Sequence, residues 1–418
     1  MGKLKIVYPV CCGMDVHRDF LIACIASTNS QGVTDYQIRR FSTYSGGLRD
    51  LRDWLAANHC RDVCMESTGK YWFPVHNILE ASCNVIVSHP KFVKAIKGKK
   101  TDKKDAQWIA DLFKHDLVRG SFIPPFDIRQ LRDLCRYWCK LTAHMTGEKN
   151  RAQNCLTVSN FKLDSVFRDV FGKSASAITT QLLQHPGETF DVAPFVHGRC
   201  KTPIPQIQEA VDGCFAPQQA EKLKIIRSHM DSLEKLKLEL ESLILGIAEK
   251  YLPQIELLLT VPGIKEPFTA IRILAEIGAD MSVFETAKHL TSWAGLTPQN
   301  AESAGKKKTT RIGKSGAYIK PLLVQIALAA SRSDKYPEIK GKHQILKKRR
   351  GGKKATIAIA RRILVAIYHM LGKNEEYNPN LYIKEENPPV SRRITPEQAL
   401  MMVSQMGYVI TGTVLLPI

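Results

Sequence analysis

The chain alternates between short apolar runs and amphipathic segments up to residue 115, and this order restricts the fold more than any other feature. Runs rich in Val, Ile, Phe and Tyr predict three successive strands, at 5–14, 20–27 and 33–42. Helical periodicity follows at 46–58, 71–82 and 102–115. Two further apolar runs, 63–65 and 84–88, separate these helices. Three strands followed by alternating helices and strands predict an α/β domain, with a meander continued by crossover connections.

The composition changes after Pro124 and Pro125, where helical patterns replace the alternation. Residues 127–160 are helical in pattern, and 203–250 carry Leu and Ile at intervals of three and four residues. These segments predict a long helical or coiled-coil arm, while 161–202 have no assignable pattern. A third, mainly helical unit begins near residue 254. The expected domains are 1–120, 121–252 and 253–375, with a tail at 376–418.

The net charge points to a polyanionic partner. Sixty Lys and Arg residues oppose forty Asp and Glu, which gives +20 at pH 7. Binding to phosphates releases condensed counterions, so a clustered surplus of this size favours a nucleic acid. A basic protein without such a partner is the alternative.

The cysteines and the apolar segments indicate a cytoplasmic protein without a membrane partner. Eleven cysteines are scattered without a paired framework. Cys60 and Cys64, like Cys135 and Cys139, have the i,i+4 spacing that presents two thiolates on one helix face. No second CxxC-type pair completes a zinc site with either of them, so we expect buried, reduced thiols. We find no signal segment, and the apolar runs at 255–261 and 410–418 are too short to cross a bilayer.

Acidic residues stand where two of the predicted strands end. Asp15 follows the first strand and Glu66 the fourth, and ligands of open α/β sheets bind beyond the carboxyl ends of strands. Asp102 and Asp105 are three apart, which places both carboxylates on one helix face. Four carboxylates gathered in this way would require cations between them, and two Mg²⁺ ions suit in-line attack on a phosphodiester.

Each acidic residue also has an ordinary structural interpretation. Any one of them can be a helix cap or a solvated charge, and Asp102 in particular can be a helix N-cap. Asp19 and Asp111 lie nearby in the sequence and are competing candidates.

Three basic segments are candidate phosphate-binding surfaces, although each can also be a solvated face. The segment 91–104 carries seven lysines next to the acidic pair, and 340–362 places a basic tract before an apolar helix. A localisation signal is the alternative for 340–362. The third segment is a Gly- and Lys-rich loop at 303–316. The residues selected as nucleic-acid-binding are Lys97, Lys99, Lys100, Lys103, Lys104, Lys306, Lys307, Lys308, Arg311, Lys314, Lys347, Lys348, Arg349 and Arg350.

The loop at 303–316 contains a candidate nucleophile, Ser303. A serine hydroxyl needs a base or a metal to take its proton, and the only acid nearby in sequence is Glu302. A flexible basic loop is therefore the alternative. Gly313-Lys314-Ser315 lacks the upstream glycine of a Walker phosphate loop. The segment around Gly263 resembles a helix-hairpin-helix, a motif that also occurs as a plain helix connection.

Several motifs together resemble the DEDD transposases of insertion-sequence family 110, which include the Piv-type DNA invertases and the bridge-RNA-guided recombinases. GMDVHRDF surrounds Asp15, MESTGKYW surrounds Glu66, and KTDKKDAQWIADL contains Asp102 and Asp105. LTSWAGLTPQNAESAGKKKTTRIGKSGAYIKPLL contains Ser303, and RRGGKKATIAIARRILVAIYHML follows it. The motifs occur in the family's order over most of residues 8–375.

The resemblance implies a RuvC-like, RNase H-type fold in which Asp15, Glu66, Asp102 and Asp105 bind Mg²⁺. Ser303 would be the nucleophile that joins covalently to DNA, with Ser315 as the alternative. The implied partners are donor and target double-stranded DNA, a noncoding guide RNA, and further copies of the chain in a homodimer or homotetramer. The helical arm would serve protomer contacts and RNA binding.

Three functions are therefore in competition. The first is an RNA-guided recombinase or transposase, which rejoins strands through a protein–DNA adduct. The second is a structure-selective endonuclease that uses the acidic site alone and leaves free ends. The third is a noncatalytic nucleic-acid-binding protein, in which the acidic residues are structural.

Overall fold

The structure, a computed structural model, describes residues 4–93, 101–298, 301–303, 306–309, 311–382 and 401. These residues form two compact units. The first comprises Met1–Leu252 and Ile271–Val283, and the second comprises Pro253–Ala270 and Phe284–Ile418.

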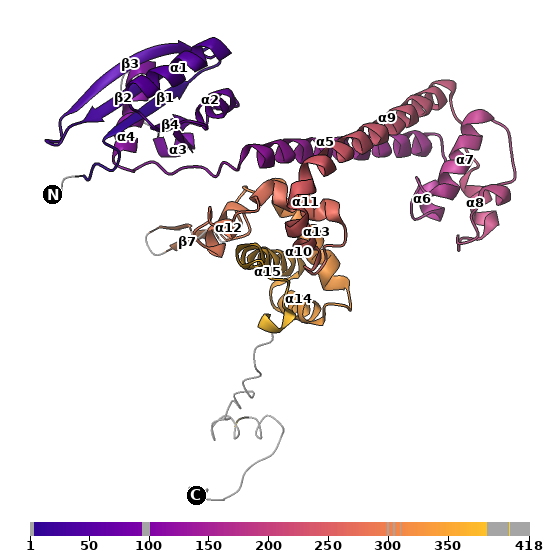
Figure 1. The fold of residues 1–418 in the computed structure, drawn as a ribbon. Helices are drawn as coiled ribbons and strands as arrows, with labels where there is room; N and C mark the ends of the chain where they lie inside the picture. Colours follow the sequence, from indigo (N-terminus) through magenta and orange to yellow (C-terminus); the bar gives the residue numbers. More distant parts are fainter. Residues whose placement is uncertain are drawn as a thin grey trace, which may run out of the picture. The chain divides into compact units, whose positions relative to one another are not determined.

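A five-stranded mixed sheet is the centre of the N-terminal region (Figure 1). Its strands are β1 (Val10–Val16), β2 (Phe20–Thr28), β3 (Thr34–Ser42), β4 (Asp62–Glu66) and β5 (Asn84–Ser88). They lie in the order β3-β2-β1-β4-β5. The first three strands are antiparallel neighbours, whereas β4 is parallel to β1 and to β5. The expected mixed α/β layout is confirmed.

The first strand starts later than the apolar run at 5–14 predicts. Pro9 has no backbone N–H, and β1 begins immediately after it at Val10. The backbone N–H groups of Val7 and Tyr8 instead donate to the carbonyl oxygen of Lys114. The segment before β1 is thereby tied to a helix rather than to the sheet.

Helices cover both faces of the sheet. One face packs against α1 (Ser45–Ala57) and α2 (Trp72–Leu79), through a core that includes Leu51, Leu55 and Val75. The other packs against α4 (Asp102–Lys114), whose Ala106, Ile109 and Phe113 are buried. The short α3 (Pro90–Val93) adds Val93 to this second core. Alternate residues of each strand therefore face α4, as the two-residue period of a strand requires.

The helical arm consists of two antiparallel helices, α5 (Phe126–Val158) and α9 (Pro217–Ala248). Trp138 Nε1 donates to Glu241 Oε1 at 2.6 Å, and His229 Nδ1 lies 3.1 Å from Glu148 Oε1. The connection between them packs on the ends of both helices, in a core that includes Leu156, Ile178 and Leu223. It contains α6 (Leu163–Val166), α7 (Lys173–Gln184), η1 (Ala193–Phe195) and α8 (Ile204–Ala210).

The segment 203–250 is largely helical, as its pattern predicts, and the chain turns within it between α8 and α9. A Cβ atom on Gly213 would lie 2.5 Å from the carbonyl oxygen of Ser159, so the backbone passes tightly against the end of α5. Pro217 then starts α9 at a position where a missing N–H costs nothing. The segment 161–202, which has no clear periodicity, forms the helices of this connection.

The C-terminal region is helical, as expected. It contains η2 (Glu249–Tyr251), α10 (Leu252–Leu259), α11 (Pro267–Ile277), α12 (Ala287–Trp293), α13 (Ile319–Arg332), α14 (Pro337–Arg350), α15 (Gly352–Lys373) and η3 (Pro379–Tyr382). In the described part of the chain, α15 alone has the length and composition to cross a membrane. Half of that stretch is buried, and the helix packs on α12, α13 and α14, as a core helix does.

A hairpin replaces part of the loop that the sequence predicts at 303–316. The strands β6 (Ala301–Ser303) and β7 (Lys306–Thr309) pair antiparallel, with Ser303 opposite Lys306. The helix-hairpin-helix around Gly263 stays a prediction.

Candidate active site

Asp15 and Glu66 lie side by side at the carboxyl ends of two adjacent strands. Met14 of β1 is in register with Met65 of β4, so the residues that follow them stand level. Asp15 is four residues after Cys11 on β1, and Glu66 is two residues after Cys64 on β4. Both cysteines pack towards α4, and residues an even number of positions apart on a strand project to the same face. The two carboxylates therefore project from the sheet on the α4 face.

Gly13 allows α4 to lie directly on β1. A Cβ atom at this position would be 2.2 Å from the backbone nitrogen of Ala110 and 2.4 Å from the carbonyl oxygen of Ala106. A larger residue would hold the helix away from the sheet. The close approach brings the first turn of α4, with Asp102 and Asp105, to the same end of β1 as Asp15.

The carboxylate of Asp15 lies within electrostatic range of the other three acidic residues. Burial raises the pKa of Asp15, whose side chain is 17% exposed, and the negative charges of Asp102, Asp105 and Glu66 raise it further. His17 acts in the opposite direction. The structure thus brings together all four acidic residues selected from the sequence.

His17 is a member of this cluster that the sequence analysis did not select. Its Nε2 atom lies 3.2 Å from Asp15 Oδ2 and 3.7 Å from Asp102 Oδ1. One possible ligand atom from each of the three residues falls within 4.8 Å of the others, a spacing suited to a metal ion. In the sequence, only its position two residues after Asp15, in the turn before β2, indicates that His17 lies near the acidic residues.

The structure excludes the capping role of Asp102 and leaves its side chain 51% exposed. The N-cap of α4 is Thr101, whose hydroxyl accepts the N–H of Lys104 at 3.4 Å, so Asp102 is not the cap. Asp19 is 72% exposed and its carboxylate lies 3.6 Å from Arg18 Nε. Glu66 accepts a hydrogen bond from the Thr68 hydroxyl at 2.7 Å.

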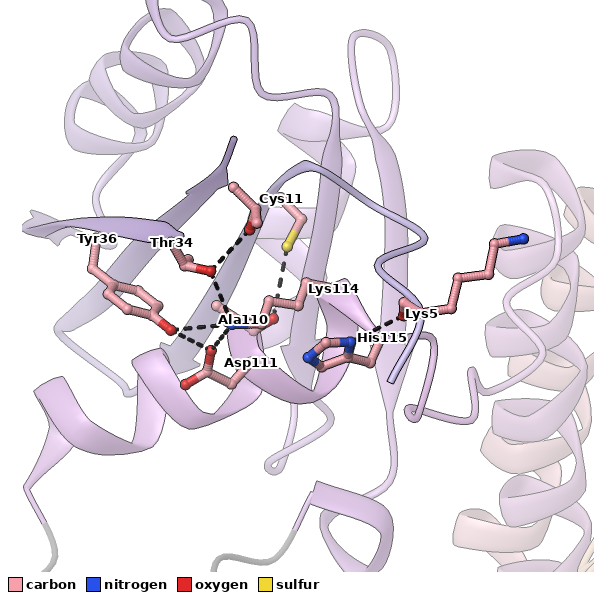
Figure 2. A network of polar contacts seen from close by, with 9 residues as sticks. Lys5, Cys11, Thr34, Tyr36, Ala110, Asp111, Lys114 and His115 are labelled. Carbon is pink, nitrogen blue, oxygen red and sulfur yellow. Dashed lines mark hydrogen bonds and ion pairs between the residues drawn. The ribbon is translucent and has the colours of Figure 1, made fainter. Parts of the chain in front are cut away.

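Asp111 belongs to a separate polar network at the other end of α4 (Figure 2). Lys114 Nζ donates to Asp111 Oδ1 at 2.6 Å, to the Tyr36 hydroxyl at 3.2 Å and to the Thr34 hydroxyl at 3.3 Å. The Tyr36 hydroxyl also donates to Asp111 at 2.5 Å. The negative charge of Asp111 is therefore balanced by Lys114, and the network holds the C-terminal end of α4 on β3.

Part of the predicted basic surface can be placed. Lys103 and Lys104 are exposed on the first turn of α4, beside the acidic cluster. Arg311 and Lys314 are exposed, as is the last turn of α14 with Lys347, Lys348, Arg349 and Arg350. Lys306, Lys307 and Lys308 lie on β7. Lys97, Lys99 and Lys100 lie outside the described residues.

The candidate nucleophile belongs to the second compact unit. Ser303 is the last residue of β6, and its side chain is outside the described part. Ser315 is exposed, and its backbone passes so close to Gly295 that a Cβ atom there would lie 2.5 Å from the Ser315 carbonyl oxygen.

The cysteine pairs form no metal site within the described residues, where Asp15, His17 and Asp102 are the one group with suitable spacing. Cys60, Cys64 and Cys135 are buried free thiols. Burial raises the pKa of Cys64 to about 12, which keeps it protonated at neutral pH.

Comparison with known proteins adds evidence independent of this geometry. Residues 12–160 match a family of DEDD transposases of the IS110 type, and 255–344 match the transposase family IS116/IS110/IS902. The chain is 31% identical over 383 residues to the pilin gene-inverting protein of Moraxella bovis, and 32% identical to that of Moraxella lacunata. Each alignment covers 88% of this chain and 98% of the relative.

Among solved structures, the fowlpox virus resolvase in complex with Holliday junction DNA is similar over 25% of this chain and 72% of its own. The TM-score is 0.18 and the identity is 16%, and this likeness is too low to support any conclusion about the fold. The two family matches and the near full-length relatives are decisive. The chain belongs to the IS110 family of transposases, and it is an enzyme that cuts and rejoins DNA.

Proposed function

We propose that this transposase cleaves DNA at the acidic site with two Mg²⁺ ions held by Asp15, Glu66, Asp102 and Asp105. The observation that carries the proposal is the gathering of four like charges at the ends of β1 and β4 and the first turn of α4. Such a cluster is unfavourable without cations, and oxygen ligands are the ones that Mg²⁺ prefers. When bound, the ions would stabilise the charge on the attacking and leaving oxygens.

The chain's own residues then position the substrate. The Asp15 side chain is more enclosed than that of Asp102, at 17% exposed against 51%. His17 lies beside both of these carboxylates and would help to position them. Lys103 and Lys104 extend from the same helical turn and attract the phosphate backbone to the site.

We further propose Ser303 as the nucleophile of strand exchange. Its hydroxyl oxygen bonds to a DNA phosphorus while the phosphorus–oxygen bond to the neighbouring nucleotide breaks. The serine loses its proton, and the departing nucleotide oxygen gains one. The paired strand β7 supplies Lys306, Lys307 and Lys308 next to Ser303 in the hairpin, where they would hold the phosphate.

The remaining assignments concern partners and domains. We propose a RuvC-like, RNase H-type domain at 1–120, an arm at 121–252, a serine domain at 253–375 and a tail at 376–418. The order β3-β2-β1-β4-β5 supports the first of these. A noncoding guide RNA would select donor and target duplexes, and a homodimer or homotetramer would combine acidic and serine sites from different protomers.

The test of the acidic site compares a substitution on β1 with one on α4, the helix that covers this face of the sheet. Asp15→Asn is expected to lower strand cleavage by about 10²–10³-fold, as the loss of a group that stabilises transition-state charge does. Asp111→Asn is the control and should retain cleavage, because its network lies at the far end of α4. Equal cleavage by wild type and Asp15→Asn would reject the proposal.

The test of serine chemistry uses Ser303→Ala and Ser315→Ala. Ser303→Ala should abolish both recombination and the covalent protein–DNA adduct, while Ser315→Ala keeps both. The opposite pattern would move the role to Ser315. Nicked DNA with free ends and no adduct from the wild-type protein would favour the structure-selective endonuclease.

A further inference from the structure

Arg40 on β3 lies in the same row of the sheet as the acidic cluster. Arg40 is in register with Ile22 of β2, and Ile22 is in register with Asp15 of β1. Two strand spacings separate Arg40 from Asp15, roughly 10 Å between backbones. The row continues to Glu66, which stands level with Asp15 on β4.

Arg40 also shares the face of the sheet that carries the acidic cluster. Tyr36, four residues earlier on β3, bonds to Asp111 of α4, and Ile22 is buried in the core beneath α4. Residues separated by an even number on a strand project to the same side. Arg40 therefore projects to the side of Asp15 and Glu66, whereas its neighbours Arg39 and Phe41 project to the side of α1.

A chain of ring contacts links Arg40 to the cluster. The guanidinium carbon of Arg40 lies 4.1 Å from the centre of the Phe20 ring, within stacking range. The Phe20 ring centre is 4.7 Å from that of His17, which lies 3.2 Å from Asp15. Stacking fixes the guanidinium plane while leaving its N–H donors at the edges.

The charge of Arg40 has no acidic counterpart among the described residues. Asp19, the acidic residue closest to Phe20 in sequence, pairs with Arg18 instead. Arg40 is exposed, so its guanidinium can be reached by a ligand from solvent. A fixed, planar cation beside a site for phosphodiester chemistry suits bidentate binding of a phosphate.

We infer that Arg40, stacked on Phe20, forms a phosphate-binding subsite for the DNA strand that enters the acidic site. The inference rests on the proposed function of that site. The DNA strand would cross the sheet end from β3 towards β4, with Arg40 holding a phosphate that flanks the one cleaved. This subsite lies on the opposite side of Asp15 from β4, and it adds to the lysines of α4.

The experiment measures binding of the full-length protein to a fluorescent duplex DNA in EDTA, over a series of salt concentrations. Arg40→Ala should weaken binding about tenfold at low salt. It should also reduce the slope of log affinity against log salt by about 0.9, the value for one phosphate contact. Arg40→Lys should keep the slope and lose part of the affinity, because a lysine retains charge without the planar fork.

Arg39→Ala is the matched control, since it removes the same charge from the next residue on the opposite face. Equal effects of Arg39→Ala and Arg40→Ala, or no effect of Arg40→Ala, would overturn the inference. A loss seen with duplex RNA and not with duplex DNA would also overturn it. Binding in EDTA does not depend on catalysis, so a failure of the acidic site would appear only in the cleavage assay with Asp15→Asn.

Discussion

The two ends of α4 carry the same kinds of residue on the same helix, yet their charges are arranged in opposite ways. At the C-terminal end, Asp111 is balanced by Lys114 and enclosed by Tyr36 and Thr34. At the N-terminal end, Asp102 and Asp105 face two further carboxylates, with His17 as the neighbouring base. Folding alone explains the first arrangement. The second costs stability unless cations bind between the carboxylates.

The largest effect is expected from Gly13→Ala, which would separate α4 from the sheet at both ends. The added Cβ atom would overlap backbone atoms of Ala110 and Ala106, and backbone cannot move aside as a flexible side chain can. We expect a loss of about 3 kcal/mol in unfolding free energy, measured by urea denaturation, and loss of cleavage. Gly46→Ala in α1, where no atom lies within 4 Å of the added Cβ, should leave stability and cleavage intact. A fully stable and active Gly13→Ala protein would contradict the packing argument.

The next effect is expected from Lys114→Met, which disrupts the balanced end. The variant keeps the apolar stem but leaves Asp111 and Tyr36 without their cation, and we expect a loss of about 2 kcal/mol at pH 8. Although burial lowers the pKa of Lys114, the hydrogen bond with Asp111 opposes it, and the pKa ends above its ordinary 10.5. The stabilisation is therefore complete below pH 10.5 and is lost as pH rises through the higher folded-state pKa. Urea denaturation at pH 8 and at a pH above the folded-state pKa of Lys114 measures the difference in unfolding free energy between wild type and variant. This difference should be smaller at the higher pH.

The pattern of the sequence is sufficient to predict that the acidic residues lie near one another, and insufficient to predict which other residues surround them. Asp15 and Glu66 were identified because strand ends and acidic residues coincide in the sequence. His17 was not, because a lone histidine after a strand has no periodicity to mark it. Neither could the register that aligns Arg40 with Asp15 be predicted, since strand pairing depends on contacts far apart in the chain.

Two further features of the fold could not be predicted from the sequence for similar reasons. The break between α8 and α9 depends on the tight passage of Gly213 against Ser159, which no local pattern of Leu and Ile records. Part of the loop predicted at 303–316 instead belongs to β6 and β7: glycine and lysine are poor strand formers, and the pairing of the two strands overrides that preference. Contacts between residues far apart in the sequence therefore determine both the turn between α8 and α9 and the pairing of β6 with β7.

A smaller effect, of opposite sign, is expected from Asp15→Asn, beside the N-terminal end of α4. Removing a buried charge from among like charges should raise unfolding free energy by about 1 kcal/mol without metal, because the ionised form is disfavoured there. Adding Mg²⁺ should raise the melting temperature of the wild type and not that of the variant. Differential scanning fluorimetry in EDTA and in Mg²⁺ measures both. Asp111→Asn is the control, and it should lose stability yet keep the response to Mg²⁺.

The smallest effect is expected from Thr101→Ala, which removes the N-cap of α4. The hydrogen bond from Lys104 is long, at 3.4 Å, so the cost should be at the low end for a cap, about 0.5–1 kcal/mol. Thr286→Ala in α12 is the matched variant, because its hydroxyl accepts a similar bond from His289 at 3.2 Å. Both should lose comparable stability in urea denaturation. Only Thr101→Ala should also slow cleavage, since the turn that it loosens carries Asp102 and Asp105. Equal cleavage by the two variants would mean that the position of this turn does not limit the chemistry.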